Sequence, residues 1–372
     1  MVSDIHIFHL SVKKMKILFF VDSFQGGAGN VIQILAVEFK KRGYDCTIFL
    51  ANRKIVPPKY DLKGIKVIEV DLNKEAPGKM PFDRIIRQKN YIHRLFNKEK
   101  PDVVISFLTE NNILSCMAKD RKLPLFISER IDPAKANTKI HWRILRWLEY
   151  GKANKVVLQC SNFADFCGGK FKSITEIVPN PILMPTHLHT VDFSDHTITF
   201  ISMGRLTGQK NFPWMFEQMA RIHEKVPNSV LHIYGNGGEK DKLNQMIHEK
   251  GWENFIQIVG YADEPYEILS KADVYLMTSD YEGFPNALSE AMAVGLPSVS
   301  RKCHDGISDL VRDGVNGYLV NPDDKASFVE LAVELAMNTD LRKEISDEAK
   351  KVSTTFGVEA ISDIWEKLIR GA

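Results

Sequence analysis

Short apolar runs alternate with longer amphipathic stretches along almost the whole chain, and this alternation constrains the fold most. The short runs have the character of buried strands, while in the longer stretches apolar residues recur every three or four positions, as in helices. This alternation predicts a doubly wound parallel sheet of the α/β class. The first series has expected strands at residues 15–21, 45–50, 65–69, 103–106, 125–128 and 155–159, and expected helices at 27–42, 82–98, 112–118 and 141–153.

The alternation pauses once and then resumes, which predicts two domains in this chain of 372 residues. We expect an extension at residues 1–14, a first Rossmann-like domain at 15–182, a linker at 183–196 and a second Rossmann-like domain at 197–355. The second series has expected strands at 197–203, 230–234, 256–259, 274–277, 298–300 and 317–320, with expected helices between them, one of them at 213–222. Further helices are expected at 325–338, 341–351 and 357–370.

Two glutamates, Glu282 and Glu290, are separated by the seven residues GFPNALS. Gly283 and Pro285 favour a turn, and the apolar residues that follow predict a short helix that stops at Gly295. The free N–H groups at a helix start suit a phosphate, and carboxylates accept hydrogen bonds from sugar hydroxyls. A sugar nucleotide carries both groups. The alternative is two surface glutamates near a helix start, where acidic residues are common.

A second pattern is the loop GRLTGQKN, residues 204–211, between an expected strand and an expected helix. Open parallel sheets bind ligands at the carboxyl ends of their strands, where this loop places Arg205 and Lys210. Arg can bind two phosphate oxygens at once and Lys adds a point charge, so the pair could hold a diphosphate as it leaves. The alternative is a solvated basic loop.

A glycine-rich turn, GGAG at residues 26–29, follows the first expected strand and opens a helix. Its backbone can approach a phosphate or a sugar closely. The turn does not match the dinucleotide fingerprint, because Ile32 stands at the third glycine position. By itself it indicates a tight turn or a ligand site equally.

These motifs resemble those of a known family, the retaining nucleotide-sugar glycosyltransferases of family 4, which have the GT-B fold. In the carboxyl half the resemblance is carried by GRLTGQKN, EGFPNALSE, YGNG (234–237) and IVGYADE (258–264). In the amino half it is carried by QGGAG (25–29), PDVVISFLTENNI (101–113), ISERIDP (127–133) and VPNPI (178–182). The combination is similar to the branch that adds galactose or N-acetylgalactosamine type sugars to lipid-linked bacterial glycans.

The resemblance implies two Rossmann-like domains that face each other across a cleft, with the last helix, 357–370, packing back on the first domain. It assigns Glu290 to the nucleotide ribose, and Glu282 with the backbone of 283–286 to the transferred sugar. The catalytic residues that it implies are Arg205, Lys210 and Glu282. The donor-binding residues that it implies are Gly26, Gly27, Gly204, Asn211, Gly235, Gly260, Tyr261, Gly283, Phe284, Pro285, Asn286 and Glu290.

The sequence contains no Asp-x-Asp string, and its eleven histidines form no metal-binding pattern. His187 and His189 fall in the expected linker and are interpreted as polar linker residues. We therefore expect no metal site and no cofactor, the nucleotide sugar being a substrate. Arg205, Lys210 and helix N-terminal amides would neutralise the leaving diphosphate. The resemblance implies front-face attack, in which the leaving phosphate takes the acceptor proton.

The sequence departs from the family pattern at one position. Many members have a histidine after the fourth-strand region that contacts the donor sugar, whereas the candidate loops here read SFL (106–108) and SER (128–130). Glu129 and Arg130 are candidates for the acceptor site, with a surface ion pair as the alternative. His304 is a candidate for contact with the sugar, with a plain loop as the alternative.

Charge is divided unevenly between the two halves, although the net charge is only +2. Residues 1–190 contain 31 Lys and Arg against 18 Asp and Glu, and residues 191–372 contain 18 against 29. Basic and apolar residues are interleaved at 82–100 and 139–155, which is typical of a helix on an anionic membrane surface. A core-facing helix with a solvated basic side predicts the same periodicity. No nucleic-acid motif accompanies these residues, so we expect no nucleic-acid partner.

The hydrophobic fraction of 44% is typical of globular proteins, and neither a membrane-spanning run nor a signal-peptide core is visible. We expect a cytoplasmic enzyme, with peripheral attachment to the inner face of the membrane as the finer interpretation. Five cysteines without a CxxC pair are interpreted as reduced thiols. The expected partners are a nucleotide sugar and a glycan or lipid-linked glycan acceptor. Two alternatives remain, which are another GT-B enzyme, such as a sugar-nucleotide epimerase or a phosphorylase, and a non-catalytic partner protein.

Overall fold

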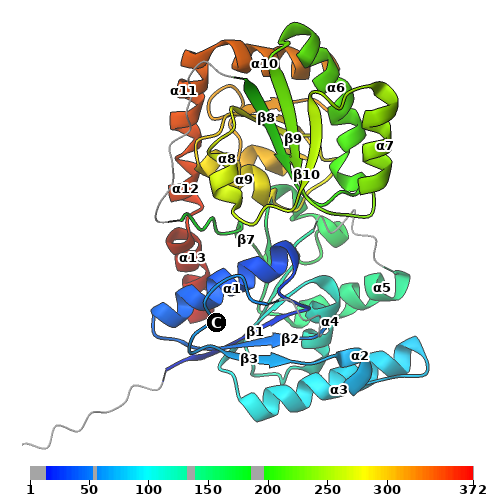
Figure 1. Ribbon diagram of the computed structural model, residues 1–372. Coiled ribbons are helices and arrows are strands. Elements are labelled where there is room, and N and C mark those ends of the chain that lie inside the picture. The colour runs from blue at the N-terminus through cyan, green and yellow to red at the C-terminus, as the bar shows by residue number, and fades with distance from the viewer. Residues whose placement is uncertain (1–13, 53–56, 132–138, 186–196, 372) are drawn as a thin grey trace, which may run out of the picture. The chain divides into compact units, whose positions relative to one another are not determined.

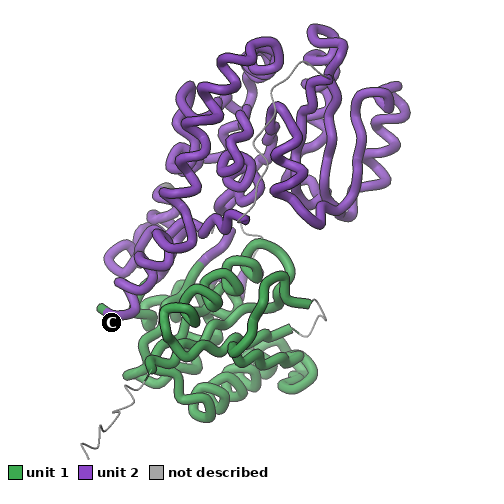
Figure 2. Tube along the Cα trace, turned by 60° about the vertical axis from the view of Figure 1, so that its left-hand side comes forward, with its two compact units in different colours: residues 1–128, 144–155, 371–372 green, residues 129–143, 156–370 purple. Residues whose placement is uncertain are grey.

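The computed structural model describes residues 14–52, 57–131, 139–185 and 197–371. Its contacts divide the chain into two compact units (Figure 2). Unit 1 comprises residues 1–128, 144–155 and 371–372, and unit 2 comprises residues 129–143 and 156–370. His187, His189 and most of the expected linker lie outside the described residues, so the domain boundaries given above stay predictions.

The first sheet has seven strands in the order β3-β2-β1-β4-β5-β6-β7. Apolar side chains fill the central strands, since Val21 and the four residues before it are buried in β1. Strand β1 pairs in parallel with β2 on one side and β4 on the other, as the strand and helix alternation predicts. The strands are β1 (Lys16–Val21), β2 (Asp45–Leu50), β3 (Lys66–Glu69), β4 (Val103–Phe107), β5 (Leu125–Ser128), β6 (Lys155–Leu158) and β7 (Thr175–Ile177).

The second sheet has six parallel strands in the order β10-β9-β8-β11-β12-β13 (Figure 1). The strand order reverses between β8 and β11, and ligands bind at such switch points in open parallel sheets. The loops that follow these two strands carry GRLTGQKN and EGFPNALSE. The strands are β8 (Ile198–Met203), β9 (Ser229–Tyr234), β10 (Ile256–Gly260), β11 (Val274–Met277), β12 (Ser298–Arg301) and β13 (Tyr318–Val320).

Helices cover both faces of this second sheet (Figure 1). Side chains of α6, α7 and α10 form one core cluster with the strands, and Phe212, Phe216 and Met219 give α6 its buried stripe. Helix α9 packs on β11 and β12 and contacts α8, α11 and α12. The helices after β8 are α6 (Phe212–Lys225), α7 (Lys240–Lys250), α8 (Pro265–Leu269), α9 (Asn286–Ala293), α10 (Lys325–Met337), α11 (Thr339–Ala349), α12 (Val352–Thr355) and α13 (Val358–Arg370).

The helices of the first series agree with the expected ones to within a few residues. They are α1 (Gly26–Lys41), α2 (Leu72–Glu75), α3 (Pro81–Glu99), α4 (Thr109–Ala118) and α5 (Ile140–Glu149). The helix expected to reach residue 153 ends at Glu149 and passes into a 3-10 turn, Tyr150–Lys152, which contains a glycine. The short elements α2 and β7 were not among the expected ones, because so few residues show no periodicity.

Helix α5 leaves its apolar stripe exposed. Ile140, Ile144, Trp147 and Leu148 are all at least half exposed, whereas Trp142 is buried. The stripe therefore does not face a core in this structure, which contradicts the core-facing interpretation of residues 139–155. The solvated basic side of that alternative is present only in part, because Arg146 is buried while Arg143 is exposed.

Candidate functional site

Glycines let the ends of β8 and β9 approach each other closely. A Cβ atom on Gly235 would lie 1.8 Å from the carbonyl oxygen of Gly204, and one on Gly237 would lie 2.3 Å from that of Leu206. A Cβ atom on Gly204 would lie 2.8 Å from Cε of Lys210. Gly235 and Gly237 are therefore required by packing against backbone atoms, and Gly204 leaves room for the aliphatic part of the Lys210 side chain at the end of β8.

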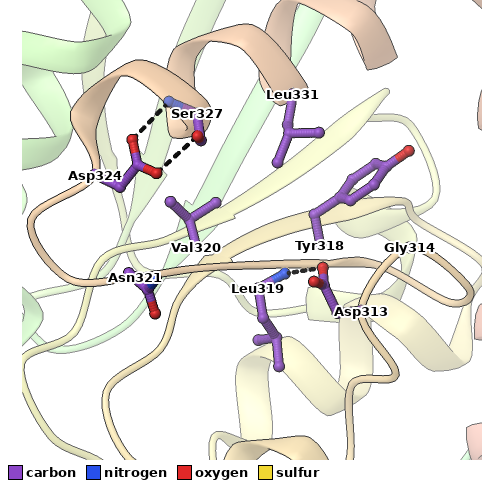
Figure 3. A pocket seen from close by; sticks show the side chains of 9 residues that line it. All are labelled: Asp313, Gly314, Tyr318, Leu319, Val320, Asn321, Asp324, Ser327 and Leu331. Carbon is purple, nitrogen blue, oxygen red and sulfur yellow. Dashed lines mark hydrogen bonds between the residues drawn. The ribbon is translucent and has the colours of Figure 1, made fainter.

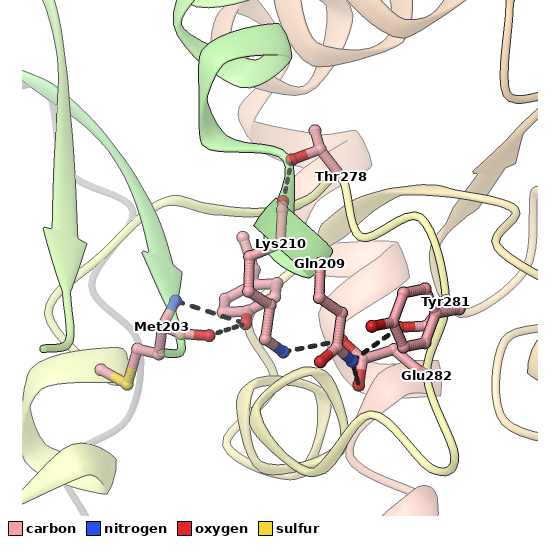
Figure 4. A network of polar contacts seen from close by, with 7 residues as sticks. Met203, Gln209, Lys210, Thr278, Tyr281 and Glu282 are labelled. Carbon is pink, nitrogen blue, oxygen red and sulfur yellow. Dashed lines mark hydrogen bonds and ion pairs between the residues drawn. The ribbon is translucent and has the colours of Figure 1, made fainter. Parts of the chain in front are cut away.

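An ion pair joins the loops after β8 and β11. Lys210 Nζ lies 2.6 Å from Glu282 Oε1, and the two side chains are 20% and 9% exposed (Figure 4). Gln209 donates from Nε2 to the carbonyl oxygen of Tyr281 at 2.8 Å and to Glu282 Oε2 at 3.5 Å. Thr278 Oγ1 donates to the carbonyl oxygen of Lys210 at 3.0 Å. The structure thus brings together one cation and one carboxylate that stand 72 residues apart in sequence.

The negative charges of Glu282 and Glu290 both raise the pKa of the buried Tyr275 hydroxyl. The Tyr275 hydroxyl lies 3.4 Å from the carbonyl oxygen of Met203 at the end of β8. Burial raises the pKa of Tyr275, and the negative charges of Glu282 and Glu290 raise it further. The sequence pattern predicted that these two glutamates flank one helix N-terminus. In the structure Glu282 precedes α9 by a short loop, and Glu290 lies within α9.

Arg205 lies on the same loop as Lys210 but differs from it in environment. Its side chain is exposed and makes no hydrogen bond or ion pair within the described residues. Asn211, at the end of the loop, has φ of 50° and donates from Nδ2 to Asp280 Oδ1 at 3.0 Å. Asp280 also pairs with Arg301, so the loop after β8 is fixed to the loop after β11 while Arg205 stays accessible.

The remaining predicted donor residues fall into an exposed and a buried group. Tyr261 is exposed, and it follows Gly260, whose φ of 118° favours glycine. Phe284 is buried and packs edge-on against Phe356, with ring centroids 5.9 Å apart. Its side chain is therefore taken up by packing within the fold. Pro285 directly precedes α9 rather than lying in its first turn.

The amino-terminal glycine turn is open. Gly26 and Gly27 are exposed at the start of α1, and Gly26 has φ of 80°. Gln25, the residue before α1, makes no capping hydrogen bond with its side chain. Gly29, which received no role from the sequence, has no room for a Cβ atom, which would lie 2.5 Å from the carbonyl oxygen of Ser23. The turn thus combines an exposed start with a tightly packed base.

The candidates for the acceptor site are less exposed than expected. Glu129 and Arg130 are buried, so the interpretation as a surface ion pair is wrong. Arg130 donates from Nη1 to Asn180 Oδ1 at 2.5 Å, and burial lowers the pKa of its guanidinium. His304 is half-buried, and its ring lies 5.3 Å from that of Phe163. None of these contacts assigns an acceptor, and that role stays a prediction.

Sequence reasoning missed several residues that build the site, namely Gln159, Cys160, Asn180, Gln209, Tyr275, Thr278 and Asp280. Asn180 lies in the VPNPI motif, which was noticed without a role for the asparagine. A separate surface depression is lined by residues of β13, of α10 and of the loops beside them, including Tyr318, Asn321 and Ser327, and shares no residue with the candidate site (Figure 3). Within the described ranges, no group of three or more His, Cys, Asp or Glu side chains could hold a metal ion.

Comparison with known proteins identifies the family. Residues 189–352 match the model "Glycosyl transferases group 1", and residues 16–157 match the model "Glycosyl transferase 4-like". The chain is a glycosyltransferase of this family. Its two parallel sheets are the two Rossmann-like domains of the GT-B fold. The resemblance drawn from the sequence motifs is therefore confirmed.

Named relatives resemble this glycosyltransferase over most of its length. It is 26% identical to the lipopolysaccharide 1,6-galactosyltransferase of Escherichia coli, over 95% of this chain and 97% of that protein. It is 27% identical to the Campylobacter jejuni α-1,4-N-acetyl-D-galactosaminyltransferase named for a PP-undecaprenol glycan, over 75% of this chain and 77% of that protein. The crystal structure of Anabaena HepE with UDP-glucose superposes with a TM-score of 0.74 and 19% identity, covering 96% of this chain and 100% of that one.

Proposed function

We propose that this glycosyltransferase moves a hexose or N-acetylhexosamine, of the galactose or N-acetylgalactosamine type, from a UDP-linked donor to a lipid-linked or polysaccharide acceptor. The observation that carries the proposal is the Lys210 and Glu282 pair at the switch point between β8 and β11. A cation suits the diphosphate and a carboxylate suits sugar hydroxyls. The names of the Escherichia coli and Campylobacter relatives support the sugar type, and the UDP-glucose complex of HepE supports the nucleotide.

The proposed mechanism depends on stabilising the negative charge that develops on the leaving diphosphate. An acceptor hydroxyl oxygen forms a bond to the anomeric carbon while the bond from that carbon to the phosphate oxygen breaks. In the proposed retaining mechanism the leaving phosphate receives the hydroxyl proton on the same face. Lys210, the exposed Arg205 and the N-terminal amides of α9 stabilise the negative charge that grows on the diphosphate. Glu282 holds hydroxyls of the sugar, and Glu290 holds those of the ribose.

The acceptor side of the proposal involves the membrane surface. The exposed face of α5 combines Ile140, Ile144, Trp147 and Leu148 with the cation of Arg143, the composition of an interfacial helix. We propose that this face rests on anionic lipid, where a lipid-linked acceptor resides. No helix within the described ranges is long and apolar enough to span a bilayer.

Replacing the cations tests the donor site. Lys210→Ala and Arg205→Ala should each lower the transfer rate by about 100-fold, the scale of one preorganised electrostatic contact. The rate is measured with a panel of UDP-hexoses and UDP-N-acetylhexosamines, and thermal melting checks that each variant folds. Arg221→Ala, an exposed arginine on α6, is the control and should keep the wild-type rate. Near-normal turnover in both loop variants would refute the proposed site.

The leaving-group chemistry predicts that transfer persists in EDTA. The two cations of the loop after β8 would supply the charge that a divalent ion supplies in other transferases. The transfer rate is measured in chelator, in added magnesium and in added manganese. Because no step of the proposed mechanism needs a metal ion, the three rates should agree to within about twofold. Loss of activity in chelator that either ion restores would contradict the metal-independent mechanism.

A further inference from the structure

A polar relay within unit 2 reaches the segment that follows Glu282 and ends at Asn286, the first residue of α9. We call residues 283–286 the donor loop. Asn180 is 4% exposed, and its Oδ1 accepts hydrogen bonds from Arg130 Nη1 at 2.5 Å and from Gln159 Nε2 at 2.8 Å. Its Nδ2 donates to Asn286 Oδ1, in the donor loop, at 2.6 Å. Two donors and one acceptor, from three different parts of unit 2, therefore meet at the buried amide of Asn180.

The two donors on Oδ1 fix the orientation of the Asn180 amide. Arg130 carries only donors, and Gln159 presents its amide nitrogen, so the oxygen of Asn180 must face them. The amide nitrogen of Asn180 then faces Asn286, which must present its own oxygen in return. The Nδ2 group of Asn286 makes no hydrogen bond within the described residues and is left to donate elsewhere. The direction of the relay thus sets which group of Asn286 a ligand meets.

Other contacts hold the donor loop where this relay reaches it. Cys160 Sγ donates to the carbonyl oxygen of Gly283 at 3.0 Å, and a Cβ atom on Gly283 would lie 2.5 Å from Gln159 Oε1. Phe284 packs on Phe356, whose carbonyl oxygen accepts from the backbone N–H of Ile182 at 2.7 Å. The segments around residues 160, 180 and 356 therefore enclose the loop, and none of them lies in the two motifs that bear Lys210 and Glu282.

We propose that Asn180 is a positioning residue that turns the Asn286 amide so that its N–H group donates to an oxygen of the sugar nucleotide. The inference rests on the proposed function, because it takes the donor loop as the place where the sugar nucleotide lies. Asn180 touches no reacting atom and acts through Asn286. Its contribution is to the affinity for the donor, and the step of bond exchange does not depend on it.

Asn180→Asp separates positioning from plain packing. The carboxylate keeps the size of the side chain and still accepts from Arg130 and Gln159, but it cannot donate to Asn286. The Asn286 amide then turns its nitrogen toward residue 180 and presents an oxygen to the ligand. We expect the donor KM to rise about tenfold, the scale of one net hydrogen bond, with kcat within about twofold of wild type. Asn286→Ala should give a similar KM, and the double variant should not exceed it by much, because the two residues act as one unit.

Asn316→Asp is the matched control. Asn316 is also 4% exposed, accepts from the backbone N–H of Arg312 at 2.7 Å and donates to the carbonyl oxygen of Leu310 at 3.3 Å. The same change there should leave the donor KM unchanged. A wild-type KM in Asn180→Asp, or single effects that multiply in the double variant, would overturn the inference.

Hydrogen exchange separates this inference from the proposed function. Asn180→Ala should speed amide exchange in the peptide that contains the donor loop, and Asn316→Ala should not. If wild-type protein binds no UDP-sugar and transfers none, the proposed function fails, and the exchange rates alone decide whether Asn180 holds the loop. Unchanged exchange in Asn180→Ala would overturn the positioning role whatever the activity.

Discussion

Helices α5 and α13 have similar amphipathic sequences, but the apolar face is exposed in α5 and covered in α13. Each carries isoleucine, leucine and tryptophan at helical spacing with basic residues between them. In α13 the stripe is covered, since Ile361, Trp365 and Ile369 are almost fully buried. In α5 Trp147 is 51% exposed, and Ile140 and Ile144 are exposed as well. Periodicity thus predicts an apolar face in both helices but does not say what covers it.

The difference separates two uses of apolar area. Covered area stabilises the fold, whereas exposed area of several large side chains on one helix face marks a surface for a partner or a membrane. The basic residues then distinguish the two further. Arg143 lies on the exposed face of α5, where it can meet anionic lipid, while exposed cations such as Lys367 on α13 accompany a face that is already covered.

The tryptophans should give the largest contrast. Trp365→Ala removes a fully buried side chain and should destabilise the fold by about 3–5 kcal/mol. Trp147→Ala removes an exposed one and should change the free energy of unfolding by less than about 0.5 kcal/mol. Chemical denaturation of both variants measures the difference. Equal losses would mean that α5 is as well covered as α13.

Charge reversal on the exposed face should have the next largest effect. Arg143→Glu changes the local charge by two, and at about 1 kcal/mol per charge near an anionic surface it should weaken binding to phosphatidylserine vesicles about 30-fold. The loss should shrink as salt rises, because charges are screened over about 10 Å at 0.1 M. Arg146 is unsuitable for this test because it is buried.

Lys367→Glu makes the same charge change on α13 and is the control. It should leave vesicle binding at the wild-type level, and both variants should keep wild-type affinity for UDP, measured by calorimetry. Vesicle binding that is absent, or that does not depend on salt, with full transfer to a short water-soluble acceptor, would show that the face of α5 does not bind lipid.

A smaller effect is expected from the apolar part of the same face. Ile144→Ser removes apolar area that would enter the lipid interface, and it should weaken vesicle binding by about fivefold, or about 1 kcal/mol. Ile364→Ser, on the exposed side of α13, is the matched control and should have no effect. A titration of vesicles against tryptophan fluorescence measures both. Equal behaviour of the two variants would remove the distinction between the helices.

Local sequence was sufficient for the alternating elements and for the two motif loops. Strands β2, β5 and β11 begin and end at the expected residues, because buried apolar runs bounded by turn residues have little freedom. Lys210 and Glu282 were expected in one site, and the parallel sheet brings them together. The relay through Asn180 could not be predicted, because a short polar residue in a proline-rich turn shows no periodicity, and its partners, Arg130 and Asn286, are far away in sequence. The burial of Arg130 was missed because its partner Asn180 is also far away in sequence.

The ion pair between Lys210 and Glu282 has a consequence for which ligands this site can bind. Because the charges of Lys210 and Glu282 neutralise each other, the attraction of this loop for an anion comes from the exposed Arg205. A phosphate that bound Lys210 would leave the nearly buried carboxylate of Glu282 without its counter-charge, and breaking such a pair costs about 3–5 kcal/mol. A neutral sugar that bound Glu282 would likewise leave the ammonium group of Lys210 without its partner. A molecule that carries an anion and hydroxyl groups at once satisfies both. Under the proposed function, the pair would therefore disfavour inorganic phosphate and free sugars and favour compounds that join the two.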